Sequence, residues 1–128
     1  MGGDAEAVAR QFFARPFDGR PRDAFAQLAE DVVIKPSNGQ IYIGHEGYVR
    51  WYEEQAGDYS DRVFVPSAIE VVRDHWVLMQ GAAENTTQDG ETELQPGCWL
   101  VHIRDGHVAA VLHYKTEQAA REALSEQR

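Results

Sequence analysis

Five histidines and one cysteine are the residues of this sequence best suited to acid–base, nucleophilic or metal chemistry. The histidines show neither an HExxH motif nor any other paired spacing of metal ligands, so no metal site is predicted. Cys98 precedes Trp99 inside a predicted strand, where a thiol is expected to fill the core rather than act as a nucleophile. An imidazole can nevertheless take or give a proton near neutral pH, so acid–base chemistry by a histidine stays open.

The aromatic side chains form a second group, whose spacing could line a ligand pocket. Tyr48, Trp51 and Tyr52 recur at i, i+3 and i+4, which places them on one side of a helix. Aromatic residues at such spacing fill a core by default, although Trp and Tyr also suit places where a polar ring edge meets water or a ligand. Both interpretations stay open for Trp51 and Trp99. The expected pocket is lined by Phe13, Tyr48, Trp51, Tyr52, Trp76, Trp99, Val101 and Val111.

The charge balance and the glycines narrow the expected partners. Twelve basic residues against 21 acidic residues give a formal net charge of −9. A surface this acidic repels phosphate backbones and anionic headgroups, so neither nucleic acid nor a membrane is an expected partner. The glycines match neither a phosphate loop nor a dinucleotide fingerprint, so no cofactor is expected. A small apolar or aromatic molecule is the expected partner.

Length and the first residues set the expected organisation and location. A chain of 128 residues predicts a single domain over 1–128. Charged residues stand near the N-terminus where a signal peptide would need an apolar run. The one cysteine cannot form an internal disulfide, as expected for a protein in a reducing compartment. The sequence therefore predicts a cytoplasmic protein.

Helical periodicity dominates the first half of the chain, and long β-rich runs dominate the second half. The expected helices are 4–15, 22–29 and 45–56, with short strands at 32–34 and 40–43. The later strands, separated by turn residues, are 62–73, 75–87, 93–104 and 107–114. A last short helix begins near Glu117, with Thr116 as its N-cap. This order predicts an α+β fold with the N-terminal helices packed on one face of a curved antiparallel sheet.

The turn at Asp105-Gly106 decides which side chains of the last hairpin share a face. A three-residue loop with a glycine bulge pairs Ile103 with His107, which places Trp99, Val101 and Ile103 on the face of Ala109, Val111 and His113. A two-residue turn instead places His113 with Cys98, Leu100 and His102. The longer loop is preferred here, because it groups the aromatic and β-branched residues.

Two segments carry a resemblance to a known superfamily. Residues 99–114 (WLVHIRDGHVAAVLHY) resemble the closing hairpin of SnoaL-like proteins, and 44–52 (GHEGYVRWY) is similar to their glycine-led helix. Together with the element order, they make the chain resemble the nuclear-transport-factor-2-like superfamily, which includes ketosteroid isomerase and the SnoaL-like polyketide cyclases. The resemblance implies a cone-shaped sheet with helices on its concave face, a short C-terminal helix and a deep, mostly apolar cavity.

The resemblance also implies roles for individual positions. The aspartate base of ketosteroid isomerase falls at Pro36 and its oxyanion-hole aspartate at Trp99, so steroid isomerisation by that machinery is not expected. Limonene epoxide hydrolase, another relative, has a tyrosine-asparagine pair that Ile34 and Pro36 match poorly. SnoaL-like cyclases place an acid–base aspartate on the last strand, where this chain has His113. The resemblance therefore implies proton transfer by His113. The alternative, which also stays open, is a histidine at a strand end that is hydrogen-bonded to the backbone or to solvent.

Three functional hypotheses remain open. The first is a homodimeric SnoaL-like protein that acts as a lyase, isomerase or cyclase through His113. The second is a ligand-binding or accessory module of the same fold without catalysis, and the third is an interaction domain that uses the convex sheet face. The dimer is expected because both faces of the later strands carry apolar residues, such as Leu78, Leu100 and Leu112, and the face without helices needs cover.

Overall fold

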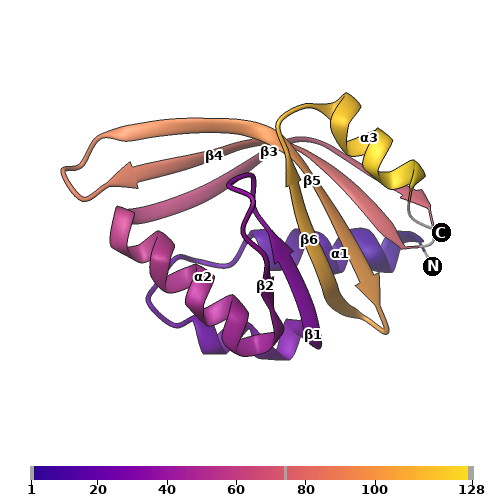
Figure 1. Cartoon of the computed structure of the whole chain (residues 1–128), viewed down its shortest axis with the longest axis horizontal. Coiled ribbons are helices and arrows are strands. Elements are labelled where there is room, and N and C mark those ends of the chain that lie inside the picture. The colour runs from indigo at the N-terminus through magenta and orange to yellow at the C-terminus, as the bar shows by residue number, and fades with distance from the viewer. Residues whose placement is uncertain (1, 74, 127–128) are drawn as a thin grey trace.

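Helices and short strands alternate in the N-terminal half of the chain, and four long strands with one helix follow (Figure 1). The structure is a computed structural model that describes residues 2–73 and 75–126. The helical elements are α1 (Gly2–Phe13), the 3-10 helix η1 (Pro21–Gln27), α2 (Gly44–Asp58) and α3 (Glu117–Ser125). The strands are β1 (Leu28–Lys35), β2 (Tyr42–Ile43), β3 (Tyr59–Arg73), β4 (Trp76–Thr87), β5 (Thr92–Arg104) and β6 (His107–Tyr114).

The six strands form one curved sheet in the order β2-β1-β6-β5-β4-β3. The pair β1 and β6 is parallel, and the other neighbouring pairs are antiparallel. The sheet stays open, with β2 and β3 at its edges. The predicted α+β fold, with a curved, mainly antiparallel sheet and a short C-terminal helix, is confirmed.

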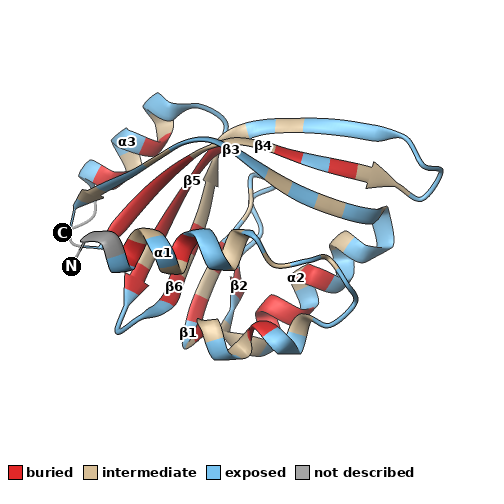
Figure 2. Cartoon of the chain, turned by 180° about the vertical axis from the view of Figure 1, so that it is seen from behind, coloured by how far each residue is buried: buried red, intermediate tan, exposed pale blue. Residues whose placement is uncertain are grey.

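Alternation along the long strands sends neighbouring side chains to opposite faces of the sheet. Val77 and Val101 belong to a core cluster with α1, η1 and α2, whereas Leu78 and Leu100 belong to a second cluster with α3. Figure 2 shows α1 crossing one face of the buried strands, with α3 on the other side. The sheet therefore has two separate apolar layers, each covered by its own helices.

The segment between α1 and α2 differs from its prediction. The expected helix 22–29 is the shorter η1, and β1 begins at Leu28 rather than at Val32. Leu28 pairs with Val108 of β6 and is only 2% exposed. The chain therefore leaves the helix at Gln27, because Leu28 is buried and pairs with β6 as the first residue of β1.

The β5–β6 hairpin corrects the expected turn. Asp105 and Gly106 form a two-residue turn between paired Arg104 and His107, and both turn residues have positive φ, 54° and 78°. Asp-Gly suits this primed turn, which matches the strand twist. The expected three-residue loop is therefore wrong. A bulge at Ala109 then shifts the register, so that the grouping of Trp99 and Val101 with Val111 and His113 is nevertheless confirmed.

Helix α3 covers the apolar residues on which the dimer prediction depended. Thr116 caps the helix as predicted, its hydroxyl accepting a hydrogen bond from the backbone N–H of Ala119 at 3.1 Å. Ala120 and Leu124 then pack on Leu78 and Leu100. The chain itself therefore buries part of the face that the sequence left uncovered.

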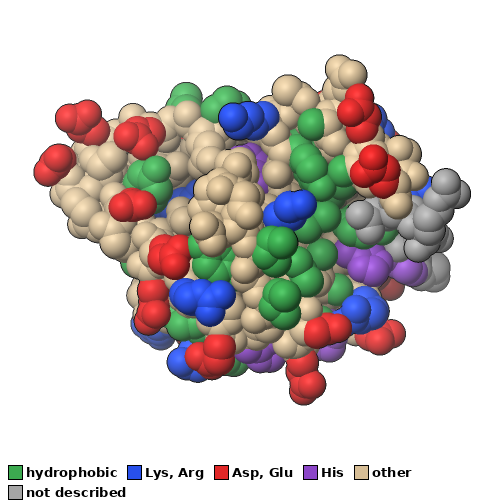
Figure 3. Space-filling view, in the orientation of Figure 1, with side chains coloured by type: hydrophobic (Ala, Val, Ile, Leu, Met, Phe, Trp, Pro, Cys, Tyr) green, Lys and Arg blue, Asp and Glu red, His purple; other side chains and the backbone are tan. Residues whose placement is uncertain are grey.

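The outer surface carries the negative charge that the composition predicts. Figure 3 shows Asp and Glu side chains along the rim of one face, with Lys and Arg side chains scattered singly among them. None of the described helices is long and apolar enough to cross a membrane.

Candidate functional site

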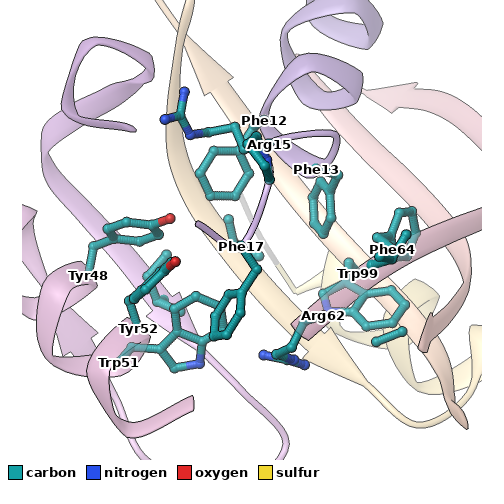
Figure 4. A pocket seen from close by; sticks show the side chains of 15 residues that line it. Phe12, Phe13, Arg15, Phe17, Tyr48, Trp51, Tyr52, Arg62, Phe64 and Trp99 are labelled. Carbon is teal, nitrogen blue, oxygen red and sulfur yellow. The ribbon is translucent and has the colours of Figure 1, made fainter. Parts of the chain in front are cut away.

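An aromatic pocket lies between α1, α2 and the concave side of the sheet, at its β3 to β5 strands (Figure 4). It encloses a cavity of about 140 Å³. Rings from distant parts of the chain form its wall: Phe13 of α1 lies 4.8 Å from Phe64 of β3, which meets Trp99 of β5 edge-on at 5.0 Å between centroids. The pocket is lined by Phe12, Phe13, Arg15, Pro16, Phe17, Ile34, Tyr48, Trp51, Tyr52, Arg62, Val63, Phe64, Ala83, Trp99 and Val111.

Helix α2 supplies one wall through the aromatic spacing seen in the sequence. Tyr48 and Tyr52 are buried and Trp51 is half-buried. The Tyr52 hydroxyl accepts a hydrogen bond from the backbone N–H of Gly19 at 2.7 Å, which ties the loop after α1 to the helix. Burial raises the pKa of Tyr48 to about 12, so its hydroxyl, which Figure 4 shows directed into the pocket, stays protonated.

A second, more polar cavity adjoins the aromatic pocket. It also measures about 140 Å³ and shares five lining residues with the first: Ile34, Trp51, Arg62, Trp99 and Val111. Its other lining residues are Lys35, Pro36, Ser37, Asn38, Gln55, Gln95 and His113. The site therefore has an apolar half and a polar half that meet at Arg62 and Trp99.

Arg62 is held at this junction by amide side chains rather than by carboxylates. Its Nε donates to Asn85 Oδ1 and its Nη1 to Gln55 Oε1, both at 2.8 Å, and its Nη2 reaches Gln95 Oε1 at 3.5 Å. The guanidinium also lies over the Trp51 ring, 5.7 Å from its centroid. Burial lowers the pKa of Arg62, the sign expected for a cation withdrawn from water.

His113 lines the polar half and stacks on Trp99, with ring centroids 4.4 Å apart and planes 12° from parallel. Its Nε2 is buried and has no hydrogen-bond partner within the described residues. Burial, and secondarily the charge of Arg62, lowers the pKa of His113, which favours a neutral imidazole. The ring fits because residue 97 is glycine: a Cβ there would lie 2.3 Å from Nε2.

Comparison with known protein families shows which domain family the chain belongs to. Residues 9–111 match the model of the SnoaL-like domain. The chain belongs to the SnoaL-like domain family. No relative was found among curated proteins.

Solved structures share the fold of this SnoaL-like domain at low sequence identity. A candidate polyketide cyclase from Xanthomonas campestris pv. campestris is 22% identical, with a TM-score of 0.70 over 92% of this chain and 94% of that one. SalBIII, described as an epoxide hydrolase/cyclase-like enzyme with a role in pyran ring formation in the polyether salinomycin, is 12% identical, with a TM-score of 0.77 over 92% and 96%. An NTF2-like protein of unknown function from Burkholderia pseudomallei K96243 is 12% identical, with a TM-score of 0.69 over 93% and 95%. The predicted resemblance to the nuclear-transport-factor-2-like superfamily is therefore confirmed.

The structure brings most of the predicted pocket residues of this SnoaL-like domain together. Phe13, Tyr48, Trp51, Tyr52, Trp99 and Val111 line the aromatic pocket, and His113 lines the adjoining polar cavity. Val101 lies in the core cluster of the same face without lining either cavity.

Trp76 is placed elsewhere, and its inclusion in the expected pocket is corrected. It lies in the cluster under α3, where its ring stacks on His102 at 4.6 Å between centroids. The reason is strand alternation: Trp76 has the same parity as Leu78 on β4 and so points away from the pocket.

Sequence reasoning missed the polar residues of the site. Arg62 and Phe64 are two residues apart on β3, so their side chains point to the same face of the sheet. This spacing could have indicated Arg62 as a pocket residue. Gln55, Asn85 and Gln95 come from three different elements, and no local pattern joins them to Arg62. Across the described parts of the chain, no group of three or more His, Cys, Asp or Glu side chains could hold a metal ion.

Proposed function

We propose that this SnoaL-like domain binds a small apolar or aromatic molecule in the two-part cavity and acts on it as a cyclase or isomerase, with His113 as the base. The observation that carries the proposal is the His113 imidazole: it stacks on Trp99 at the cavity wall, and its buried Nε2 lacks a partner. A neutral imidazole carries one nitrogen lone pair and is suited to accept a proton.

The proposed reaction starts with proton abstraction next to a substrate carbonyl. His113 takes the proton, and the electron pair of the broken C–H bond forms an enolate. For an isomerase, the imidazolium returns the proton to a different carbon. For a cyclase, the enolate carbon attacks a second carbonyl carbon of the same molecule, and the imidazolium protonates the resulting alkoxide.

The surroundings of His113 support this chemistry. The aromatic pocket places apolar rings on one side of the site, which favours a neutral base and stabilises an apolar substrate. Arg62 lines the same cavity, and its positive charge favours negative charge on a bound ligand. The similarity in fold to SalBIII, whose described role is in ring formation, also supports a cyclase.

Proton transfer can be tested with 1-phenylpropan-2-one in D₂O, following deuterium uptake next to the carbonyl by NMR. The wild-type protein should accelerate the exchange, and His113→Gln should lose about a hundredfold or more of that acceleration. His107→Gln is the matched control, since His107 is exposed at the hairpin turn. Equal acceleration by the wild type and His113→Gln would exclude His113 as the base.

One observation favours a second function, ligand binding without turnover. No carboxylate in residues 2–73 or 75–126 accepts a hydrogen bond from the His113 ring, whereas catalytic imidazoles are commonly held in one tautomer by such an acceptor. A protein that binds the ketone but gives no exchange above a buffer control would support this function.

The homodimer and the cytoplasmic location stay predictions. The exposed apolar side chains of β3 and β5, among them Val63, Val65 and Leu94, provide surface for a second copy. Light scattering should give twice the monomer mass at micromolar concentration, and a monomer mass would contradict the dimer. Fractionation of cells that produce the protein should recover it with cytoplasmic markers.

A further inference from the structure

The charge balance of the two-part cavity is unusual, because its central cation has no carboxylate partner. Arg62 forms no ion pair with any residue that the structure describes. This occurs in a chain with 21 acidic residues and only 12 basic ones. Charged groups withdrawn from water are normally paired, since desolvation disfavours an isolated charge.

The ion-paired arginines of the chain behave differently. Arg10, Arg22, Arg104 and Arg121 are all on the surface, and each pairs with a glutamate or an aspartate. Their pairs have exposed side chains and contribute little to stability. Each of these four surface arginines thus has a carboxylate beside it, whereas Arg62, which lines both parts of the cavity, has none among the described residues.

The three amide partners fix the Arg62 side chain without cancelling its charge. Asn85 is only 1% exposed, and its own Nδ2 lies 3.4 Å from Gln95 Oε1. The side-chain oxygens of Asn85, Gln55 and Gln95 each accept one hydrogen bond from Arg62. These bonds use three of the five N–H groups of the guanidinium. Two N–H groups of Arg62 thus stay available to a ligand, on a side chain that is already oriented.

The position of Arg62 defines how a ligand would lie. It lines both halves of the cavity, and Figure 4 shows its guanidinium beside Trp51 at the edge of the aromatic pocket. A ring or an alkyl body fits among the aromatic side chains, and an attached anionic group then reaches Arg62. Low polarity around the pair strengthens the attraction relative to water.

We propose that Arg62 binds the carboxylate of the ligand and that the ligand is therefore an apolar or aromatic organic acid. This inference rests on the proposed small-molecule binding at the same site and adds the chemical class of the ligand. It assigns Arg62 as a ligand-binding residue and leaves proton transfer to His113. The amide oxygens of Asn85, Gln55 and Gln95 position the guanidinium, and two donors bind the carboxylate.

Two probes of the same shape test the proposal by isothermal titration calorimetry. trans-Cinnamate carries the carboxylate, and trans-cinnamamide replaces it with a neutral amide. The wild type should bind cinnamate roughly tenfold to a hundredfold more tightly than cinnamamide, the range expected for hydrogen bonds to a charged group. Equal affinities for the two probes, or no binding of either at millimolar concentration, would overturn the proposal without any variant.

Arg62→Gln should reduce the affinity for cinnamate to that for cinnamamide while leaving cinnamamide binding in place. Arg10→Gln is the control for the loss of one positive charge, since Arg10 is exposed and paired with Glu6, and it should keep the wild-type preference. Arg15→Gln tests the other arginine of the pocket. If Arg15→Gln removes the preference and Arg62→Gln keeps it, Arg62 is not the anion site.

Two further variants keep the test decisive. Thermal melting shows whether the Arg62→Gln protein folds. If it does not, Arg62→Lys replaces it, because lysine keeps the positive charge. The Arg62→Lys protein should still prefer cinnamate, but more weakly, because lysine lacks the planar guanidinium that binds a carboxylate through two N–H groups. His113→Gln should still prefer cinnamate even if it abolishes deuterium exchange. Failure of the anion site and failure of proton transfer by His113 are thereby distinguished.

Discussion

The sheet carries a stacked tryptophan–histidine pair on each of its faces, and the two pairs differ in their surroundings. Trp99 and His113 stack at 4.4 Å on the concave face, and Trp76 and His102 stack at 4.6 Å on the face under α3. The ring geometry is nearly the same. The first pair borders a cavity with an arginine, whereas Trp76 of the second pair belongs to the cluster that α3 packs against.

The comparison shows that the helix covering each face determines its character. Helix α3 packs the side chains of Ala120, Ala123 and Leu124 directly on the strands, so the part of this face under α3 is filled. On the other face, bulky rings from α1 and α2 meet one another and hold space open between them. A stacked tryptophan and histidine therefore only fill space when they stand alone. A cavity beside the pair is what allows a ligand to reach the histidine.

The largest expected difference is in the cost of removing a tryptophan from each region. Trp76→Ala should lower the free energy of unfolding by about 3–5 kcal/mol, because it removes a ring from the filled face. Trp51→Ala should cost roughly half as much or less, since Trp51 is already half-exposed at the cavity. Urea unfolding of both variants measures this, and equal losses would mean that the cavity wall is ordinary core.

Adding volume tests the same difference in the opposite direction. Ala120→Leu should lower the free energy of unfolding by about 1–3 kcal/mol, because Ala120 is fully buried under α3. Ala83→Leu, in the cavity wall, should change it by less than about 1 kcal/mol, as free space accepts the added methyl groups. The same substitution should weaken cinnamate binding, and calorimetry that finds unchanged affinity would argue against ligand binding in this space.

Gly97 gives a sharper test of how His113 is seated. Gly97→Ala should cost roughly 1–2 kcal/mol of stability and reduce deuterium exchange, because the new Cβ would displace the imidazole. Gly57→Ala is the matched control: Gly57 lies in α2 with open space around it, so alanine should stabilise the helix by about 0.5–1 kcal/mol. A Gly97→Ala protein with normal exchange would show that the close seat of His113 is not needed for proton transfer.

The smallest effect concerns pH. Burial lowers the pKa of His113 in the folded state, so the unfolded chain binds a proton there more readily. Stability from the neutral ring is fully present above the unfolded pKa of about 6.5 and is lost as pH falls below it toward the folded pKa. His113→Gln should therefore lose less stability than the wild type between pH 7.5 and 5.5 in urea titrations. Identical pH slopes would contradict a buried neutral imidazole.

Periodicity and turn chemistry predicted much of the fold. The aromatic spacing in 45–56 predicted the side of α2 that lines the pocket. The Asp105-Gly106 dipeptide predicted where the last hairpin turns. The bulge at Ala109 could not be predicted, because a one-residue change in register has no local signature in the sequence. The grouping of Trp99 with His113 was thus right although the turn type was wrong.

Alternation determined which residues share a face, since neighbouring side chains on a strand must point to opposite sides. Within a regular strand, the sequence by itself therefore groups Trp76 with Leu78 and Arg62 with Phe64. Only the tertiary structure decided which face each set occupies, because that depends on where α1, α2 and α3 dock. The partners of Arg62 come from β4, β5 and α2, and a site assembled from such distant segments exists only once packing brings them together.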